Sequence, residues 1–486
     1  MSYTWLANLV FFPLAIYAAI VLAAREGTTG ATAWEKEREA YLASGETLDT
    51  SFRFAKPVPD EQNFGATAAL AGINANGEAG DARREKLEQL ALRHETIKWP
   101  RPKRQPFEPR AKCDLRALHH YFKETGLLEI PTKSENLAED LLASFESRFG
   151  ATIDSIVSGR DREHSVFLPL RSSLSVPGQM IFAEDPLPTS ALIGISKGLR
   201  LHGLLSLHND RPDEAAADVS SMIRVAEATS ADSKSLIPLL ISLSATRFAT
   251  DVIWEGLVDH RWTETQLEEL QSSISRVDLR RLMTDALRAE LIGLLDAVDH
   301  IDQAPAAQLG GLMELDENAA AWTSLARFWT DHNRAAILSA FARVIASAKS
   351  DRGYLMLLRQ SDSVAEQIAD TSPLNMRVVF ARVALPAYGG VIKNAARADA
   401  ELTQAATACA LERYFIANNA YPATLDELVP RFTKELPLDP VDHQPMRYRK
   451  TEDGRYQLHS IGWDGEDNNG GEGDITWNYK TKEQAD

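Results

Sequence analysis

The stretch MRYRKTEDGRYQLHS, residues 446–460, is where the sequence pattern changes from helical to extended. Its halves MRYRK and RYQLHS flank a four-residue turn that ends in Gly454, which is the spacing of a β-hairpin. After an acidic loop, DITWNY at 474–479 is rich in β-branched and aromatic residues and predicts a third strand. We therefore expect a small three-stranded antiparallel sheet near the C-terminus.

A single long helix is predicted directly before this sheet. Leu402, Ala406 and Ala410 recur every four residues, and the pattern stops before Pro422. A long helix packed on a three-stranded antiparallel sheet is a two-layer α+β unit. We place this unit at residues 391–480, followed by a short tail at 481–486.

The loop between the second and third predicted strands is strongly acidic. Residues 460–477 read SIGWDGEDNNGGEGDITW and contain five carboxylates, several glycines and no basic residue. Carboxylates held this close repel one another unless water or a cation compensates them. Because a strand on each side closes the loop, the sequence predicts a cation site here, with a solvated acidic turn as the alternative.

Four short motifs follow one another along this unit. They are A-L-x-x-Y at 410–414, N-x-x-Y-P at 418–422, D-P-x-x-x-x-P-x-x-Y at 439–448 and S-x-G-x-D-G at 460–465. In this order they resemble the globular domain of the type II secretion major pseudopilins. The prepilin-peptidase site with which that family's helix begins has no counterpart at the start of this helix.

The resemblance implies that the acidic loop binds calcium. It assigns the side chains of Asp464 and Asp474 and the backbone carbonyl of Ile461 as ligands. Asp467 and Asn469 are further candidates, because calcium accepts hard oxygen ligands from flexible glycine-rich loops. The ligand spacing is not that of an EF-hand.

Residues 115–390 carry mainly helical signals. Pro212 suits the first turn of a helix with one apolar face, and Thr263 and Gln266 have the spacing of a capping box before another helix. Residues 191–228 weakly resemble a tetratricopeptide-like helical hairpin. Stacked hairpins present surfaces for protein partners and rarely carry chemistry alone. We expect a mainly α protein whose helical-hairpin array binds protein partners.

Residues 3–24 form an uncharged apolar segment. As a helix with a rise of ~1.5 Å per residue, the segment matches a hydrocarbon core of ~30 Å, so it predicts a transmembrane anchor at residues 1–24. A signal peptide cleaved near Ala24, which would release a secreted soluble protein, is the alternative. Residues 25–114 are predicted to be a loosely ordered connector with short helices and a proline-rich basic linker at 99–112.

The side of the membrane is predicted from two opposing signals. Arg25, Lys36 and Arg38 follow the apolar segment and favour a cytoplasmic bulk by the positive-inside tendency. A calcium-binding domain favours the outside of the cytoplasmic membrane, where free calcium is plentiful. We give the domain more weight and expect a single-pass protein of the cytoplasmic membrane with a periplasmic bulk.

The sequence gives little support to catalysis. Ser196 lies in a G-x-S-x-G match, but the match falls inside a helical, leucine-rich run and lacks the preceding strand that a nucleophile elbow needs. His202 and His208 are six residues apart, which is not the i, i+4 spacing of a helical metal pair. We predict a non-catalytic protein. A hydrolase with a site between helices is the alternative.

Composition narrows the class further. The 486 residues include 52 Lys and Arg against 69 Asp and Glu, a net charge of −17, which argues against nucleic acid as a partner. Only Cys113 and Cys409 are present, so a disulfide framework is excluded, while a single bond between these two stays open.

Overall fold

The computed structural model describes residues 25–53, 55–75, 77–92, 112–131, 135–167, 188–232, 234–303, 329–372 and 375–479. The predicted anchor at residues 1–24, most of the linker at 99–112 and the tail lie outside these residues. Among the described helices, Leu236–Val258 is long and apolar enough to cross a membrane, but 61% of its apolar window is buried inside the protein. It therefore resembles a core helix more than a membrane span.

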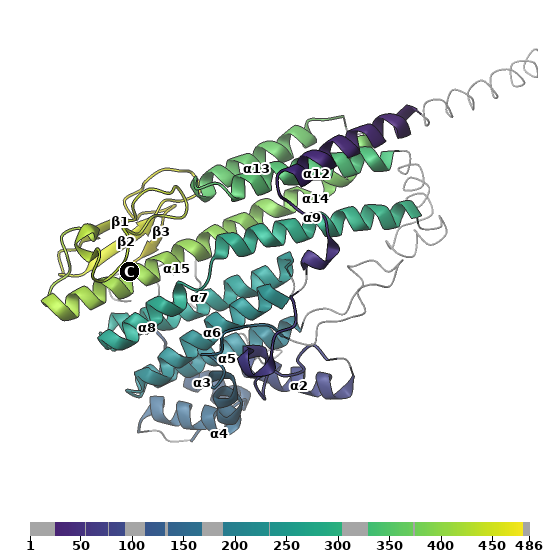
Figure 1. Cartoon of the computed structure of the whole chain (residues 1–486). Helices are drawn as coiled ribbons and strands as arrows, with labels where there is room; N and C mark the ends of the chain where they lie inside the picture. The colour runs from purple at the N-terminus through teal and green to yellow at the C-terminus, as the bar shows by residue number, and fades with distance from the viewer. Residues whose placement is uncertain are drawn as a thin grey trace, which may run out of the picture.

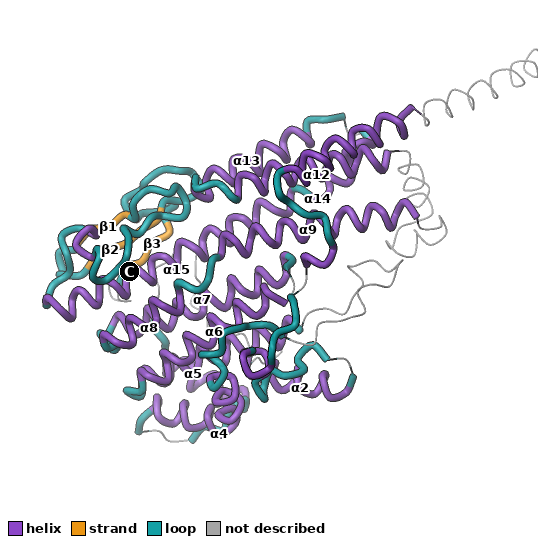
Figure 2. The backbone as a smooth tube through the Cα atoms, in the orientation of Figure 1, coloured by secondary structure: helices purple, strands orange, loops and turns teal. Residues whose placement is uncertain are grey.

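The described chain is mainly helical, as the sequence predicted, with one small antiparallel sheet near the C-terminus (Figure 2). Residues 25–43 form the first described helix. The later helices of the array are α2 (Glu78–Glu88), α3 (Leu115–Thr125), α4 (Leu137–Val157), α5 (Thr189–His208), α6 (Pro212–Asp232), α7 (Leu236–Val258), α8 (Glu264–Ile274), α9 (Leu279–Gln303), α12 (Thr330–Ala348), α13 (Gly353–Ala369) and α14 (Val379–Ala384).

Short 3-10 helices and the C-terminal elements complete the list. The 3-10 helices are η1 (Thr50–Arg53), η2 (Asp60–Gln62), η3 (Phe64–Ala66), η4 (Gln89–Ala91), η7 (Met376–Val378) and η8 (Leu425–Leu428). The C-terminal unit contains α15 (Pro386–Asn418), β1 (Arg447–Lys450), β2 (Tyr456–Ser460) and β3 (Ile475–Trp477).

Local signals in the sequence set several helix starts. The predicted capping box forms at α8, where the Thr263 hydroxyl accepts a hydrogen bond from the Gln266 amide at 3.3 Å and the Gln266 side chain accepts one from the Thr263 amide at 2.9 Å. Helix α6 begins at Pro212, as predicted, because its first turn needs no amide donor from that residue. Both predicted starts are confirmed.

Helix α15 links the array to the sheet (Figure 1). It packs against α7, α8, α9 and α13 along its length and against β2 and β3 near its C-terminal end. One hydrophobic cluster of buried side chains extends from Tyr41 to Tyr479 and includes residues of the array and of the sheet. The array and the C-terminal unit therefore share a core around this helix.

The C-terminal sheet has the order β1-β2-β3 with both pairs antiparallel. The central strand is fully buried, and Leu458 pairs with Tyr448 on one side and Trp477 on the other. Gln404 of α15 donates to the Ile475 carbonyl at 2.6 Å, which fixes the helix to the edge strand. The predicted long helix beside a three-stranded antiparallel sheet is confirmed.

The segment after residue 24 is packed more closely than the predicted connector. Glu26 in the helix at 25–43 pairs with Arg377 at 2.6 Å, and Glu46 pairs with Arg288 of α9 at 2.6 Å. Tyr41 and Phe64 are buried in the shared core. A loosely ordered connector therefore does not describe these residues, because long-range pairs and apolar burial fix them to the array.

The two cysteines are both free thiols. Cys409 is buried in α15, whereas Cys113 is half-buried just before α3. The possible bond between them, left open by the sequence, does not form in this structure.

Candidate metal centre

The acidic loop, residues 461–474, is closed at its base by the sheet. Ser460 at the end of β2 pairs with Ile475 at the start of β3. The two ends of the loop also touch, because a Cβ atom added to Gly462 would lie 2.1 Å from the Gly473 carbonyl oxygen. Only glycine fits at position 462. The loop is therefore held shut, and the carboxylates it carries are confined to a small volume.

Asp474 is the carboxylate in this loop that most needs a partner. Its side chain is fully buried, and Oδ2 accepts a hydrogen bond from the Gly470 amide at 2.8 Å. Its second oxygen, Oδ1, is buried with no hydrogen-bond partner in the described part of the chain. An unsatisfied buried carboxylate oxygen costs about 1–3 kcal/mol or more, so a ligand at this position would be stabilising.

Asp464 lies beside the backbone at both ends of the loop. A Cβ atom added to Gly473, the residue before Asp474, would lie 3.3 Å from Asp464 Oδ2. Oδ1 of Asp464 is 3.5 Å from the Cβ position of Gly462, the residue after Ile461. The exposed Asp464 carboxylate thus lies beside the neighbours of the two other ligands that the resemblance implies.

Asp467 and Asn469 have a different role. Asp467 Oδ1 accepts hydrogen bonds from His459 Nε2 and from the Asn469 amide, both at 2.9 Å, and its Oδ2 is 3.5 Å from Arg447. Partial burial opposes ionisation of Asp467, but these hydrogen bonds outweigh it and lower the pKa of the carboxyl. Asn469 contributes its backbone amide, and its side chain is exposed. Protein donors therefore already occupy Asp467.

His459 is a candidate site residue that the sequence did not indicate. Its Nε2 lies 2.9 Å from Asp467 Oδ1 and 3.9 Å from Asp474 Oδ2, so it bridges the two carboxylates from β2. Every residue of β2 is buried. The strand therefore lacks the alternation of buried and exposed residues from which the direction of the imidazole could have been predicted. The available signal was a histidine in a strand directly before an acidic loop.

Asp439 holds the base of the acidic loop through hydrogen bonds. Its Oδ1 accepts from the Ser460 hydroxyl at 2.6 Å and the Val441 amide at 2.9 Å, and its Oδ2 accepts from the Ile461 amide at 3.1 Å and Arg447 at 2.8 Å. Burial raises the pKa of Asp439, and the hydrogen bonds to Ser460 and the two amides oppose that shift. The aspartate of the D-P motif thus fixes the end of β2, from which the candidate ligands project.

The donor chemistry fits calcium. Asp464 and Asp474 offer carboxylate oxygens, Ile461 offers a backbone carbonyl, and Asp474 Oδ1 has no hydrogen-bond partner among the residues that the structure describes. Hard oxygen ligands from a short loop are the set that calcium accepts. Asp467 and His459 bond each other at 2.9 Å, and His459 Nε2 also lies 3.9 Å from Asp474 Oδ2.

Ser196 lacks the geometry of a nucleophile. It lies inside α5, is 1% exposed, and its hydroxyl donates to the Leu192 carbonyl at 3.0 Å in the preceding turn. The strand and sharp turn of a nucleophile elbow are not found around it. The G-x-S-x-G match is part of a helix, as the sequence context indicated.

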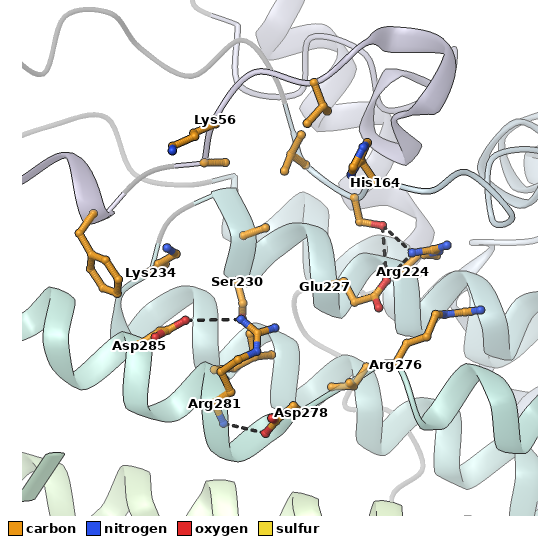
Figure 3. Close-up of a pocket in the computed structure, with 18 of the residues that line it drawn as sticks. Lys56, His164, Arg224, Glu227, Ser230, Lys234, Arg276, Asp278, Arg281 and Asp285 are labelled. Atoms are coloured by element: carbon orange, nitrogen blue, oxygen red, sulfur yellow. Dashed lines mark hydrogen bonds and ion pairs between the residues drawn. The ribbon is translucent and has the colours of Figure 1, made fainter. Parts of the chain in front are cut away.

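A cavity of about 730 Å³ lies between residues 47–58, α6 and the turn from α8 to α9 (Figure 3). Its charges pair across short distances: Arg224 bonds Glu227 at 2.8 Å, and Arg281 lies 3.5 Å from Asp285. The lining contains five basic and five acidic side chains, namely Lys56, Arg224, Lys234, Arg276 and Arg281 against Asp49, Glu163, Glu227, Asp278 and Asp285. With no excess charge, this cavity does not select a ligand of either sign.

No known protein family, curated protein or solved structure matches this chain.

Proposed function

We propose that this chain is a membrane-anchored, non-catalytic envelope protein in which calcium stiffens a pseudopilin-like C-terminal unit and the helical array binds protein partners. The observation that carries the proposal is the buried, unpartnered Oδ1 of Asp474 in a loop closed by two strands. A cation at this oxygen would also compensate the Asp464 carboxylate, which lies beside Gly473, the residue before Asp474.

The proposed location rests on calcium and on the first described helix. Free calcium is plentiful outside the cytoplasm, so a calcium-dependent fold favours the periplasmic side. The helix at 25–43 would follow directly after the proposed anchor. Its ion pair from Glu26 to Arg377, at 2.6 Å, would fix an anchored chain to the array and keep the array close to the membrane.

Limited proteolysis of the purified full chain tests the calcium centre. With calcium, we expect protection against cleavage within residues 461–474, and with a chelator we expect cleavage there. Asp474→Asn should be cleaved under both conditions. Glu472→Gln removes an exposed carboxylate of the same loop and should behave as the wild type. An identical cleavage pattern with and without calcium in the wild type would refute the proposal.

A further inference from the structure

A second cavity, of about 460 Å³, opens between α4, α5 and α6 and carries excess negative charge. Its lining contains four carboxylates and one arginine besides His202; the carboxylates are Glu146, Asp154, Glu214 and Asp218, and the arginine is Arg211. Even with a protonated histidine, the acidic groups exceed the basic ones by two. This cavity therefore differs from the balanced one beside α9, because it attracts a cation.

His202 is oriented within this cavity by a buried aspartate. Its Nδ1 lies 2.7 Å from Asp218 Oδ2, and in the neutral ring this contact places the proton on Nδ1. The lone pair is then on Nε2, which is 3.6 Å from Glu146 Oε1. Metal-binding histidines are commonly oriented in this way, with a carboxylate accepting the other ring proton.

Three potential ligand atoms converge at this point. One atom each from Glu146, His202 and Glu214 lies within 4.8 Å of the others. They come from three different helices, α4, α5 and α6. Glu146 and Glu214 are about a third exposed, so an ion can reach them from solvent.

Asp218 provides a second, independent observation at this cavity. The residue is fully buried, and its Oδ1 has no hydrogen-bond partner among the described residues. The His202 contact thus satisfies only one of its oxygens, and a positive charge beside the imidazole would compensate the rest.

We infer that this cavity binds a divalent transition metal of the zinc class, with His202 Nε2 and the carboxylates of Glu146 and Glu214 as ligands and Asp218 as the residue that orients His202. A nitrogen and two carboxylate oxygens suit zinc and leave a fourth position open to water. This site is separate from the calcium centre and does not depend on it.

Arg211 is the competitor for this metal. Its guanidinium lies 2.8 Å from Glu146 and 2.7 Å from Glu214, so it neutralises the same two carboxylates. The Arg211 side chain is 40% exposed and has room to move toward solvent. Metal and guanidinium therefore compete for the two carboxylates. Removal of Arg211 should raise the affinity for the metal, which would not be expected if the ion pair were purely structural.

Zinc titration of the full chain, stripped of metal and then saturated with calcium, tests the inference against a chromophoric zinc chelator. We expect one zinc site whose affinity falls at least about tenfold in His202→Asn and in Glu214→Gln and rises in Arg211→Gln. His208→Asn and His459→Asn should leave it unchanged, because His208 contacts Glu255 outside the cavity and His459 belongs to the C-terminal loop.

Two results would overturn the inference. One is the absence of zinc binding in the wild type. The other is zinc binding that is lost in His459→Asn while His202→Asn and Glu214→Gln retain it. Glu214 is partly exposed, so its variant keeps the test valid if the buried histidine variant fails to fold.

Discussion

Replacing Asp439 by asparagine should loosen the base of the acidic loop. The carboxylate accepts four hydrogen bonds, two on each oxygen. An asparagine keeps one oxygen, so it can retain the pair from Ser460 and Val441. Its amide group then faces the Ile461 amide and Arg447, which are both donors.

The magnitude follows from the two hydrogen bonds that are lost. One is a neutral amide bond, worth about 1 kcal/mol, and the other is a bond from a charged arginine, worth about 1.5–3 kcal/mol. The variant should therefore lower the free energy of unfolding of the C-terminal unit by about 3 kcal/mol. Urea unfolding followed by tryptophan fluorescence measures the change, since Trp477 is fully buried in this unit.

Asp442→Asn is the matched control. Asp442 bonds the same Arg447 through both oxygens, at 2.9 and 2.6 Å, but it keeps some contact with solvent. Asparagine keeps one oxygen for the bonds to Oδ1 and loses one bond from the charged arginine, worth about 1.5–3 kcal/mol, so this variant should cost about 1 kcal/mol less than Asp439→Asn. If Asp439→Asn destabilised the protein no more than Asp442→Asn, the assignment of Asp439 as the support of the loop would be wrong.

Three further substitutions test the packing of two glycines and the burial of one carboxyl group. Gly353→Ala should lower the free energy of unfolding by about 2 kcal/mol or more, because Gly353 has φ of +76° and an added Cβ would lie 2.4 Å from the Val441 carbonyl oxygen. Gly390 lies in an open helical position, so Gly390→Ala should raise the free energy of unfolding by about 0.5–1 kcal/mol in the same denaturation assay. Burial raises the pKa of Asp232 to about 7, whereas the unfolded chain releases this proton near pH ~3.9. Between these pH values the folded wild type binds one proton more than the unfolded chain. Its free energy of unfolding therefore falls by up to about 4 kcal/mol as the pH rises from the lower value to the higher one. Asp232→Asn should therefore gain stability relative to the wild type between about pH 5 and about pH 8, and equal pH dependence of the two unfolding midpoints would contradict this.

Local sequence signals predicted the C-terminal unit well. The predicted strands 446–450, 455–460 and 474–479 contain the observed strands, because alternating and aromatic residues flanked by a glycine turn depend on neighbours in sequence. The capping box at Thr263 and the helix start at Pro212 are equally local. The closure of the loop before Asp474 results from the pairing of β2 with β3, the two strands that the sequence predicted on its sides.

Features that depend on distant residues could not be predicted in this way. The packing of the segment after residue 24 rests on partners such as Arg288 and Arg377, hundreds of residues away in the chain. The cavity at His202 combines side chains of three helices, so a search for histidines at helical spacing could not detect it. His459 was missed because its partners lie in the following loop and across the sheet.

The proposed function depends on calcium binding by the acidic loop through Asp464 and Asp474. Calorimetric titration of calcium into the purified, metal-free full chain tests it most directly, with Asp464→Asn, Asp474→Asn and the control Glu472→Gln measured in parallel. We expect saturable binding in the wild type and in Glu472→Gln, and loss of this binding in both aspartate variants. Absence of binding in the wild type, or equal binding in all four proteins, would contradict it.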